Sequence, residues 1–288
     1  MIIKDPDTLP DKWGKRPSDR SVGELLKAGV IALDKPKGPT SHQVTAWARN
    51  SLHIEDISHG GTLDPYVSGV LPICLGKAVR LTDIVLSSDK EYVCLMVLHK
   101  DVKEELITKM MSRFVGKIYQ MPPVRSAVKR QLRIRTITEL EVIEIKGREV
   151  LFRASCDAGT YIRTLCTDIG EALGCGANMV ELRRTRSGGM KESDAASLHD
   201  ITDAYIFWQQ MGKERWLRSI LMPMEVLVEP LPKIIVKPTA ISAYTPPLNK
   251  PLIMAWNTCK FKGIYDPPLQ LQLTTNRHCE PDRVKTRG

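Results

Sequence analysis

Short apolar runs, separated by glycine and proline, divide the first 230 residues into helices and strands. Apolar residues spaced by three or four positions are typical of helices on a core, and continuous or alternating runs of about four to eight are typical of strands. The pattern predicts helices over residues 22–28, 40–52, 77–86, 102–114, 161–173, 198–211 and 214–221. It predicts strands over residues 30–33, 69–75, 91–98, 136–145, 149–156 and 177–182.

These elements alternate irregularly, which favours an α+β fold over a parallel sheet built from βαβ units. Thr40 and Gln43 have the spacing of a capping box at the start of the helix that ends at residue 52. Pro72 interrupts the apolar run 69–75, and proline lacks the N–H group that a central strand needs. We therefore expect this strand at an edge of the sheet or at a bulge.

The two ends of the chain lack this pattern. Residues 1–20 are polar and contain three prolines, which predicts an extended arm before a short helix. Residues 233–243 predict a strand and the start of a helix, and the tail up to Gly288 is rich in proline and polar residues. The expected domains are an N-terminal arm with a short helix over 1–29, a main body over 30–230 and a separate region over 231–288.

The charge of the chain narrows the choice of partners. The sequence carries 42 lysines and arginines against 33 aspartates and glutamates, a formal net charge of +9. This excess favours a polyanion, either nucleic acid or an acidic membrane surface. Two same-sign clusters indicate phosphate contacts or ordinary solvated faces. The first, on a predicted exposed loop over 120–135, contains Arg125, Lys129, Arg130, Arg133 and Arg135, and the second contains Arg183, Arg184 and Arg186.

The cysteines and the apolar runs indicate the compartment. The seven cysteines form no Cys-x-x-Cys pair, so neither a disulfide framework nor a zinc ribbon is expected, and a reducing cytosol fits best. The first twenty residues lack the apolar centre of a signal peptide, and no run approaches the roughly 20 apolar residues of a membrane span. The sequence predicts a soluble protein that is not secreted and has no membrane partner.

A single carboxylate stands in the stretch His59-Gly60-Gly61-Thr62-Leu63-Asp64-Pro65. The two glycines can adopt positive φ angles, and Pro65 fixes its own φ and keeps Asp64 out of the helical region. Such a turn can hold an acid in one pose. Local chemistry alone favours an Asx turn ahead of the proline, with a catalytic carboxylate as the alternative.

Four separated pieces share the order and spacing of a known family: Asp34-Lys35-Pro36, the Gly-Gly-Thr-Leu-Asp-Pro turn, Lys90-Glu91-Tyr92 and Gly159-Thr160-Tyr161-Ile162-Arg163. Together they resemble the pseudouridine synthases of the branch that includes the bacterial tRNA T-loop enzyme and dyskerin. The stretches 124–135 and 181–188 are similar to the archaeal homologue of dyskerin, the catalytic subunit of H/ACA guide RNA particles. The resemblance runs from about residue 16 to residue 243.

The resemblance implies isomerisation of uridine to pseudouridine in rRNA or tRNA, on a mixed, mainly antiparallel sheet with a central cleft. By position in the motifs, Asp64 is the expected catalytic aspartate, Tyr92 stacks on the target base and Arg163 pairs with Asp64. The residues expected to line the same cleft are Lys35, His59, Tyr161 and Leu182. Neither a metal nor another cofactor is implied.

The implied partners are a guide RNA, the target rRNA or tRNA and the small accessory proteins of the particle. The implied location is the cytoplasm for a protein of archaeal type and the nucleolus for a eukaryotic one.

The residue types suit this reaction. Breaking the bond from C1′ to N1 and joining the sugar to C5 needs no redox change, but it needs a carboxylate near the sugar, as in retaining glycosidases. A neighbouring arginine favours the ionised form of that carboxylate, and a tyrosine ring offers a face to an extruded base. Three roles for Asp64 stay open, namely attack on C1′, attack on C6 and removal of the sugar 2′ proton.

The chain departs from the family pattern near Tyr244. In the family an RNA-binding PUA domain follows the stretch 231–243, but the expected glycine-rich strands are absent here. We expect a truncated or frame-shifted PUA-like region over 231–288, which weakens the grip on the ACA end of the guide. Two alternatives therefore stay open: a guide-independent synthase that acts on the tRNA T loop, and an RNA-binding scaffold without turnover.

Overall fold

The computed structural model describes residues 2–3, 15–122, 131–229, 231, 234–235, 252–256 and 261–265. The chain divides into two compact units, one over Arg16–Pro230 and one made of Met1–Lys15 with Leu231–Gly288. In the second unit, β1 (Ile2–Ile3) pairs in parallel with β13 (Ile234–Ile235), and β14 (Leu252–Trp256) pairs antiparallel with β15 (Phe261–Tyr265). The rest of the predicted strand and helix start over 233–243 lies outside the described residues.

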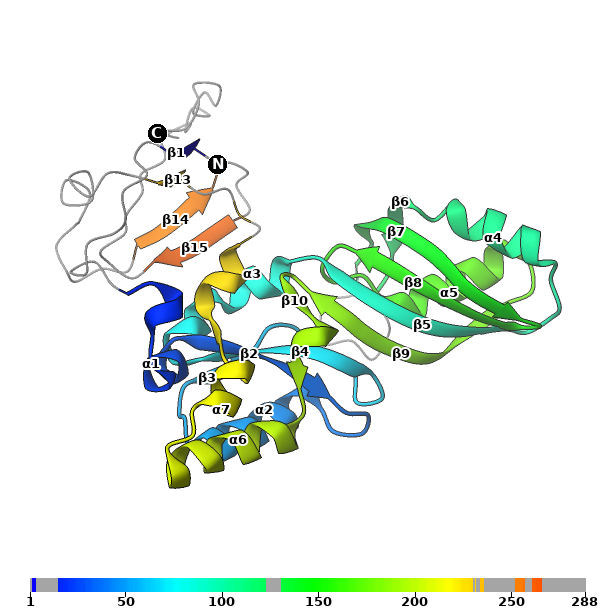
Figure 1. The fold of residues 1–288 in the computed structure, drawn as a ribbon. Helices are drawn as coiled ribbons and strands as arrows, with labels where there is room; N and C mark the ends of the chain where they lie inside the picture. Colours follow the sequence, from blue (N-terminus) through cyan, green and yellow to red (C-terminus); the bar gives the residue numbers. More distant parts are fainter. Residues whose placement is uncertain are drawn as a thin grey trace, which may run out of the picture. The chain divides into compact units, whose positions relative to one another are not determined.

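An 11-stranded sheet is the centre of the larger unit within the described residues (Figure 1). The main path of the sheet is β11-β2-β4-β9-β5-β8-β7-β6. Along it β4–β9 and β11–β2 are parallel and the other pairs are antiparallel, which confirms the predicted mixed, mainly antiparallel sheet. The strands are β2 (Gly29–Lys35), β3 (Ile57–His59), β4 (Ser68–Leu75), β5 (Lys90–Leu98), β6 (Gly116–Gln120), β7 (Arg133–Lys146), β8 (Glu149–Cys156), β9 (Ala177–Ser187), β10 (Met190–Lys191), β11 (Ala195–Ala196) and β12 (Met222–Pro223).

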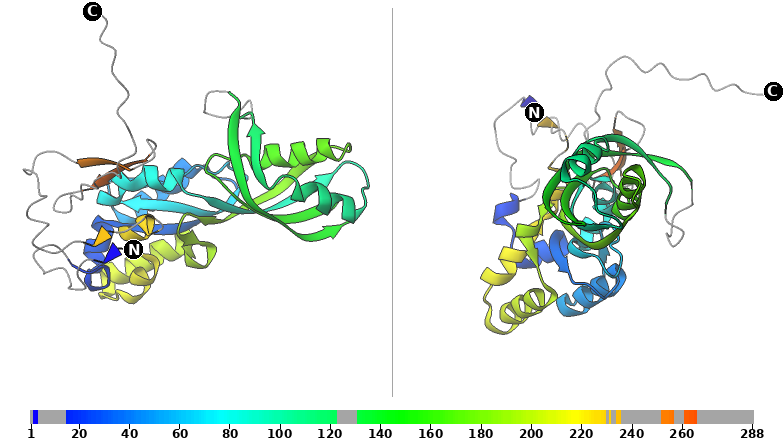
Figure 2. Two further views of the ribbon diagram at one scale, coloured as in Figure 1. Left: turned by 90° about the horizontal axis from the view of Figure 1, so that it is seen from above. Right: turned by 90° about the vertical axis from the view of Figure 1, so that its right-hand side faces the viewer.

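Helices cover both halves of this sheet. In Figure 1, α2, α6 and α7 lie along the half that holds β2 and β4, while α4 and α5 lie with β5, β8 and β9. Figure 2, where the strands of the second half are green, shows them curving around α5. The helices are η2 (Pro17–Asp19), α1 (Val22–Lys27), α2 (Ser41–Leu52), η3 (Gly76–Leu81), α3 (Thr82–Ser87), α4 (Glu104–Ser112), α5 (Ile162–Ala172), η4 (Glu192–Asp194), α6 (Leu198–Met211), α7 (Arg215–Ile220) and η5 (Met224–Val228).

The half of the sheet with β5 and β8 has one apolar core among the described residues, and the half with β2 and β4 has one on each face. Leu165 and Ile169 of α5 share one core with Met96 of β5 and Phe152 of β8. A second core joins residues of α2 and α6 to Leu71 of β4. Burial of each large apolar side chain contributes about 2 kcal/mol, so these faces fix where the helices lie.

The segment between β3 and β4 links the two cores. Ile57 of β3 and Leu71 of β4 border the second core, whereas Leu63 and Val67, which lie between them in sequence, belong to the first. The chain therefore crosses from one core to the other and back at the turn that carries Asp64.

Strand β4 lies inside the sheet, so the edge position expected from its Pro72 is wrong. On the side away from β2, β4 pairs with β9 at residues 68–69 and with β3 at residues 73–75. Pro72 falls in the gap between these partners, and its carbonyl accepts a hydrogen bond there from Gly60 N at 2.8 Å. The N and C=O groups of a strand residue point to the same side, so the missing N–H of Pro72 interrupts no ladder bond.

The predicted basic loop over 120–135 is in part strand. Strand β6, which was not predicted, ends at Gln120, and β7 begins at Arg133, so Arg133 and Arg135 lie on a strand and not on a loop. Antiparallel pairing with β6 explains this difference, because Arg133 and Arg135 lie in register with Gln120 and Ile118. The described residues do not include Arg125, Lys129 or Arg130.

Gly69 allows the close parallel contact between β4 and β9. Its φ angle is 106°, and a Cβ atom at this position would overlap the backbone of Arg184, with which Gly69 is in register. A side chain here is thus excluded both by backbone conformation and by space.

We expect Gly69→Ala to lower the free energy of unfolding by about 2–5 kcal/mol, because backbone strain adds to the overlap with β9. Gly116→Ala is the matched control, since Gly116 has a φ of 110° and open space around its Cβ position. Strain alone predicts a loss of about 1–3 kcal/mol for the control. Urea unfolding measures both, and equal losses would contradict the packing argument.

Candidate active site

The turn between β3 and β4 presents Asp64 at the surface between two buried residues. Leu63 and Val67 are 4% and 3% exposed, whereas the side chain of Asp64 is 55% exposed. Val67 N donates to Asp64 O at 3.0 Å and closes the turn, with Pro65 at the position that favours proline. Asp64 is therefore fixed at the surface by two anchors in the core.

Ser41, the first residue of α2, holds the residue before Asp64. Its hydroxyl accepts a hydrogen bond from Leu63 N at 2.9 Å and donates one to Leu63 O at 3.1 Å. Ser41 is fully buried, so these bonds are sheltered from water. Ser41 was not predicted as a site residue, and the signal that could have found it is a small polar residue directly after the Thr40 cap.

Lys35 holds the chain after Asp64. Its ammonium group is buried and donates to the carbonyl oxygens of Pro36 at 2.9 Å, Pro65 at 3.1 Å and Val67 at 2.8 Å. Burial lowers the pKa of Lys35, and the nearby charge of Asp64 opposes this shift. We predicted Lys35 as a residue that lines the substrate cleft. Its side chain has no exposed surface, so the geometry makes it a positioning residue beneath the turn instead.

Arg163 and Asp64, far apart in the sequence, form a hydrogen-bonded ion pair. The structure thus brings this predicted pair together, while its role in catalysis stays a prediction. The side chains are 50% and 55% exposed, so the pair is open to solvent. Arg163 lies in the first turn of α5, which directs its guanidinium toward the Asp64 turn.

Gln120, at the end of β6, fixes the start of α5. Its side-chain Oε1 accepts from Tyr161 N at 2.9 Å and its Nε2 donates to Tyr161 O at 3.0 Å. Gln120 is 2% exposed, and Tyr161 is the N-cap residue of α5. This amide therefore pairs with the backbone two residues before Arg163 and helps to set where the guanidinium lies. Gln120 was not predicted, because no local sequence pattern marks such a contact.

Tyr92 of β5 lies opposite Arg184 of β9, next to an irregularity in the strand register. Burial raises the pKa of Tyr92, and the charge and hydrogen bonding of Arg184 oppose this effect. The net shift is upward, so the phenol keeps its proton at neutral pH. Tyr92 and Asp64 are near enough for the charge of Asp64 to contribute to this shift.

Arg184 is part of the interior and not of the basic surface. It is 1% exposed, its Nε donates to Val70 O at 2.7 Å, and its Nη2 donates to Gly61 O at 3.1 Å. The phosphate contact that we expected for Arg184 is therefore wrong in this conformation. Its guanidinium instead joins β9 to β4 and to Gly61, three residues before Asp64.

The other predicted basic residues differ in their burial and in the groups that their side chains contact. Arg183 binds Asp34 at 3.0 Å and Glu192 at 2.5 Å, so two carboxylates balance its charge. Arg186 is half-buried and donates to Gly188 O at 3.3 Å. Arg135 is also half-buried, and its guanidinium lies beside Gly159, in the loop that leads to α5. Arg133 precedes it on the same strand.

The remaining predicted site residues lie around the same turn. His59, the last residue of β3, has its ring edge-on to His42, with centroids 4.8 Å apart. Burial lowers the pKa of His59, and the charges of His42 and Arg184 act in the same direction, so its ring is neutral at pH 7. Leu182 is 9% exposed and belongs to the core that contains Leu63.

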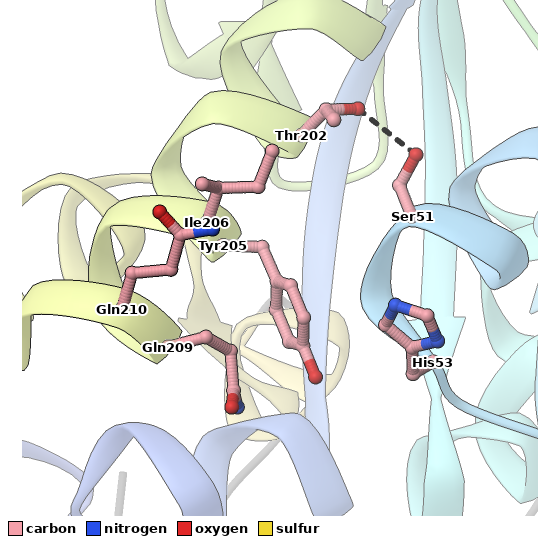
Figure 3. Close-up of a pocket in the computed structure, with 7 residues that line it drawn as sticks. All are labelled: Ser51, His53, Thr202, Tyr205, Ile206, Gln209 and Gln210. Carbon is pink, nitrogen blue, oxygen red and sulfur yellow. Dashed lines mark hydrogen bonds between the residues drawn. The ribbon is translucent and has the colours of Figure 1, made fainter.

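A cavity of about 370 Å³ lies elsewhere, between the end of α2 and α6. Figure 3 shows side chains of α6 facing Ser51 and His53, with a hydrogen bond from Thr202 to Ser51 at 2.9 Å. Ser41 contacts the Asp64 turn from the opposite end of α2, so this cavity is not part of the site described above. Among the described residues, no cluster of His, Cys, Asp or Glu side chains could hold a metal ion. No helix in the described part of the chain has the length and apolar character to cross a membrane.

Three family models match the chain in order. The DKCLD (NUC011) domain matches residues 1–45, and the N-terminal domain of the TruB family pseudouridylate synthases matches residues 49–162. The C-terminal domain of tRNA pseudouridylate synthase B matches residues 163–229. Asp64 and Tyr92 thus fall in the N-terminal family domain, and Arg163 falls at the first position of the C-terminal one.

Related proteins match along most of the chain. The probable tRNA pseudouridine synthase B of Methanothermobacter thermautotrophicus is 49% identical over 241 residues, which cover 84% of this chain and 74% of that protein. The protein of the same name from Pyrococcus furiosus is 52% identical over 248 residues, 85% of this chain and 73% of the relative.

Solved structures match over the same part of the chain. The crystal structure of a Cbf5-Nop10-Gar1 complex aligns with a TM-score of 0.79 and 52% identity, over 84% of this chain and 73% of the other. The structure of an H/ACA RNP bound to a substrate RNA containing 2′-deoxyuridine aligns with a TM-score of 0.77 and 49% identity, over 84% and 74%. These matches confirm the resemblance seen in the sequence, and the chain belongs to the TruB family of pseudouridylate synthases.

Proposed function

We propose that this pseudouridine synthase works as the catalytic subunit of an H/ACA guide RNA particle. The observation that carries the proposal is the solvent-exposed Asp64–Arg163 ion pair. Hydrogen bonds from Ser41 before Asp64 and from Lys35 after it hold the turn that carries this pair. The similarity to Cbf5 in complexes with Nop10 and Gar1, and in a particle with bound substrate RNA, supports this assembly. The proposed partners are a guide RNA, a target rRNA or tRNA and small accessory proteins, and the proposed location is the cytoplasm.

The reaction is an isomerisation, so its atoms balance without a co-reactant. The C1′–N1 bond breaks, a C1′–C5 bond forms, C5 loses a proton and N1 gains one. Asp64 acts on the nucleotide as a carboxylate, and the guanidinium of Arg163 is its ion-pair partner. Attack on C1′, attack on C6 and removal of the 2′ proton all require this ionised and exposed carboxylate.

Tyr92 serves the base in this proposal. Its ring offers a face for the uracil, which must leave its stack to reach Asp64. Because Tyr92 keeps its proton at neutral pH, its hydroxyl starts the reaction as a donor. His59, Tyr161 and Leu182 stay proposed wall residues of the site, whereas Lys35 acts on the position of the turn from below.

The RNA backbone is proposed to follow β7 toward the site. Arg133 and Arg135 lie on this strand, and Arg135 reaches the loop that precedes α5 and its Arg163. Such contacts to phosphates give a binding constant that falls steeply with salt. The proposed catalytic domain spans residues 30–230, and residues 231–288 are a proposed altered PUA-like region.

A second candidate is a guide-independent synthase that modifies tRNA directly. The relatives from Methanothermobacter thermautotrophicus and Pyrococcus furiosus both carry the name of a probable tRNA enzyme, which favours it. Release of tritium from RNA labelled at C5 of uridine distinguishes the candidates. Release that depends on a guide supports the main proposal, release from bare tRNA supports the second, and no release under either condition supports a scaffold without turnover.

We expect Asp64→Asn to lower tritium release by about a thousandfold or more, because the amide cannot act as a nucleophile or base. RNA affinity is expected to stay within about twofold, since the shape of the turn is kept. Asp101→Asn is the control, because Asp101 is an acid with 95% of its side chain exposed. Turnover by Asp64→Asn at the rate of the control would contradict the assignment.

We expect Lys35→Met to slow turnover by about ten- to a hundredfold, because three backbone carbonyls, that of Val67 fully buried, lose their donor and the turn shifts. The free energy of unfolding is expected to fall by about 2–4 kcal/mol, measured by urea unfolding. Lys37→Met is the control, since Lys37 is 48% exposed in a surface ion pair with Glu181 and should change stability by less than about 1 kcal/mol. A Lys35→Met enzyme with unchanged kcat would remove Lys35 from the positioning role.

A further inference from the structure

We propose that Tyr66 holds a nucleotide next to the target uridine by stacking on its base. This inference rests on the proposed function, because it requires that the chain binds a uridine-containing RNA at Asp64. It assigns a substrate contact to a residue outside the motifs that identify the family.

Tyr66 is displayed and not packed. It is 82% exposed, more than any other large apolar side chain among the described residues. It occupies the third position of the turn that Val67 N and Asp64 O close, where small polar residues are more usual. Neither the core nor the turn explains an aromatic ring at this position.

The backbone on both sides of Tyr66 is fixed. Pro65 O accepts hydrogen bonds from Gly38 N at 2.8 Å and from Lys35 Nζ at 3.1 Å. Val67 O accepts from Lys35 Nζ at 2.8 Å. The ring therefore projects from a backbone that is held as firmly as that of Asp64, and only the side-chain torsions of Tyr66 are free.

The order of exposure along the turn brings the ring to the site. Leu63 and Val67 point into the core, while Asp64 and Tyr66 between them point to solvent. Two residues span at most about 7 Å of chain, so the ring begins within that distance of the Asp64 backbone. An RNA strand that places its uridine at Asp64 therefore passes close to the ring of Tyr66.

When the target uridine leaves the stack, the base next to it becomes available to stack on the ring of Tyr66. A base that leaves the stack uncovers the faces of its neighbours, and each uncovered face costs free energy. Stacking on an aromatic side chain recovers about 1–3 kcal/mol per base and tolerates any base sequence. Tyr66 is therefore expected to act on RNA binding, while the chemical step at Asp64 depends on other residues.

The test compares Tyr66→Ala and Tyr66→Phe in the full chain, assembled with guide RNA. 2-Aminopurine replaces, in turn, the nucleotide on the 5′ side and on the 3′ side of the target uridine. Wild type and Tyr66→Phe are expected to quench one of these probes on binding, and Tyr66→Ala is expected to lose that quenching. The Kd and KM of Tyr66→Ala should rise about tenfold, with kcat at saturating RNA within about twofold.

Trp216→Ala is the control for loss of an exposed aromatic ring, because Trp216 is 55% exposed on α7. The proposal is overturned if Tyr66→Ala binds RNA like wild type, or if neither probe responds to the substitution. It is also overturned if Tyr66→Ala weakens binding of an accessory protein and leaves RNA affinity unchanged, since the ring then contacts protein. Binding and quenching need no turnover, so an inactive wild type would refute the proposed function without obscuring this result.

Discussion

The site depends on buried cations that bind backbone carbonyls around one turn. An ammonium or guanidinium group inside a protein is stable only when its protons meet acceptors, so its position dictates where those acceptors lie. Lys35 draws Pro65 O and Val67 O together after Asp64, and Arg184 holds Gly61 O before it. The carboxylate is thus placed by buried cations that do not reach the surface.

This arrangement explains why the functional side chains come from separate elements. The Asp64 turn joins the two cores, β5 presents Tyr92, and α5 presents Arg163. Gln120 sets the start of α5, and the parallel contact at Gly69 sets how β9, with Arg184, meets β4. The relative positions of these groups are therefore fixed by long-range packing, which a turn alone could not provide.

Particular residues show what the sequence could and could not predict. Asp64, Tyr92 and Arg163 were predicted from the family order of their motifs, and the structure brings Arg163 and Asp64 into contact. Ser41 and Gln120 were missed because each acts through a backbone partner that is close only in the folded chain. Arg184 was misplaced for another reason. A run of cations resembles a surface, but strand alternation sends Arg184 inward, while its neighbour Arg183 stays partly exposed and binds Asp34 and Glu192. Strand β6 was missed because it is short and precedes a proline pair.

The openness of the Asp64–Arg163 pair has a consequence for the order of events. An ion pair in contact with water contributes at most about 1 kcal/mol to the free energy of folding, so an incoming nucleotide can separate the two side chains at little cost. In the proposed complex RNA covers the pair and excludes water, so the local dielectric falls and the attraction between the two charges grows several-fold. On that proposal the free enzyme holds the two charges loosely, and the bound substrate completes the environment in which they act.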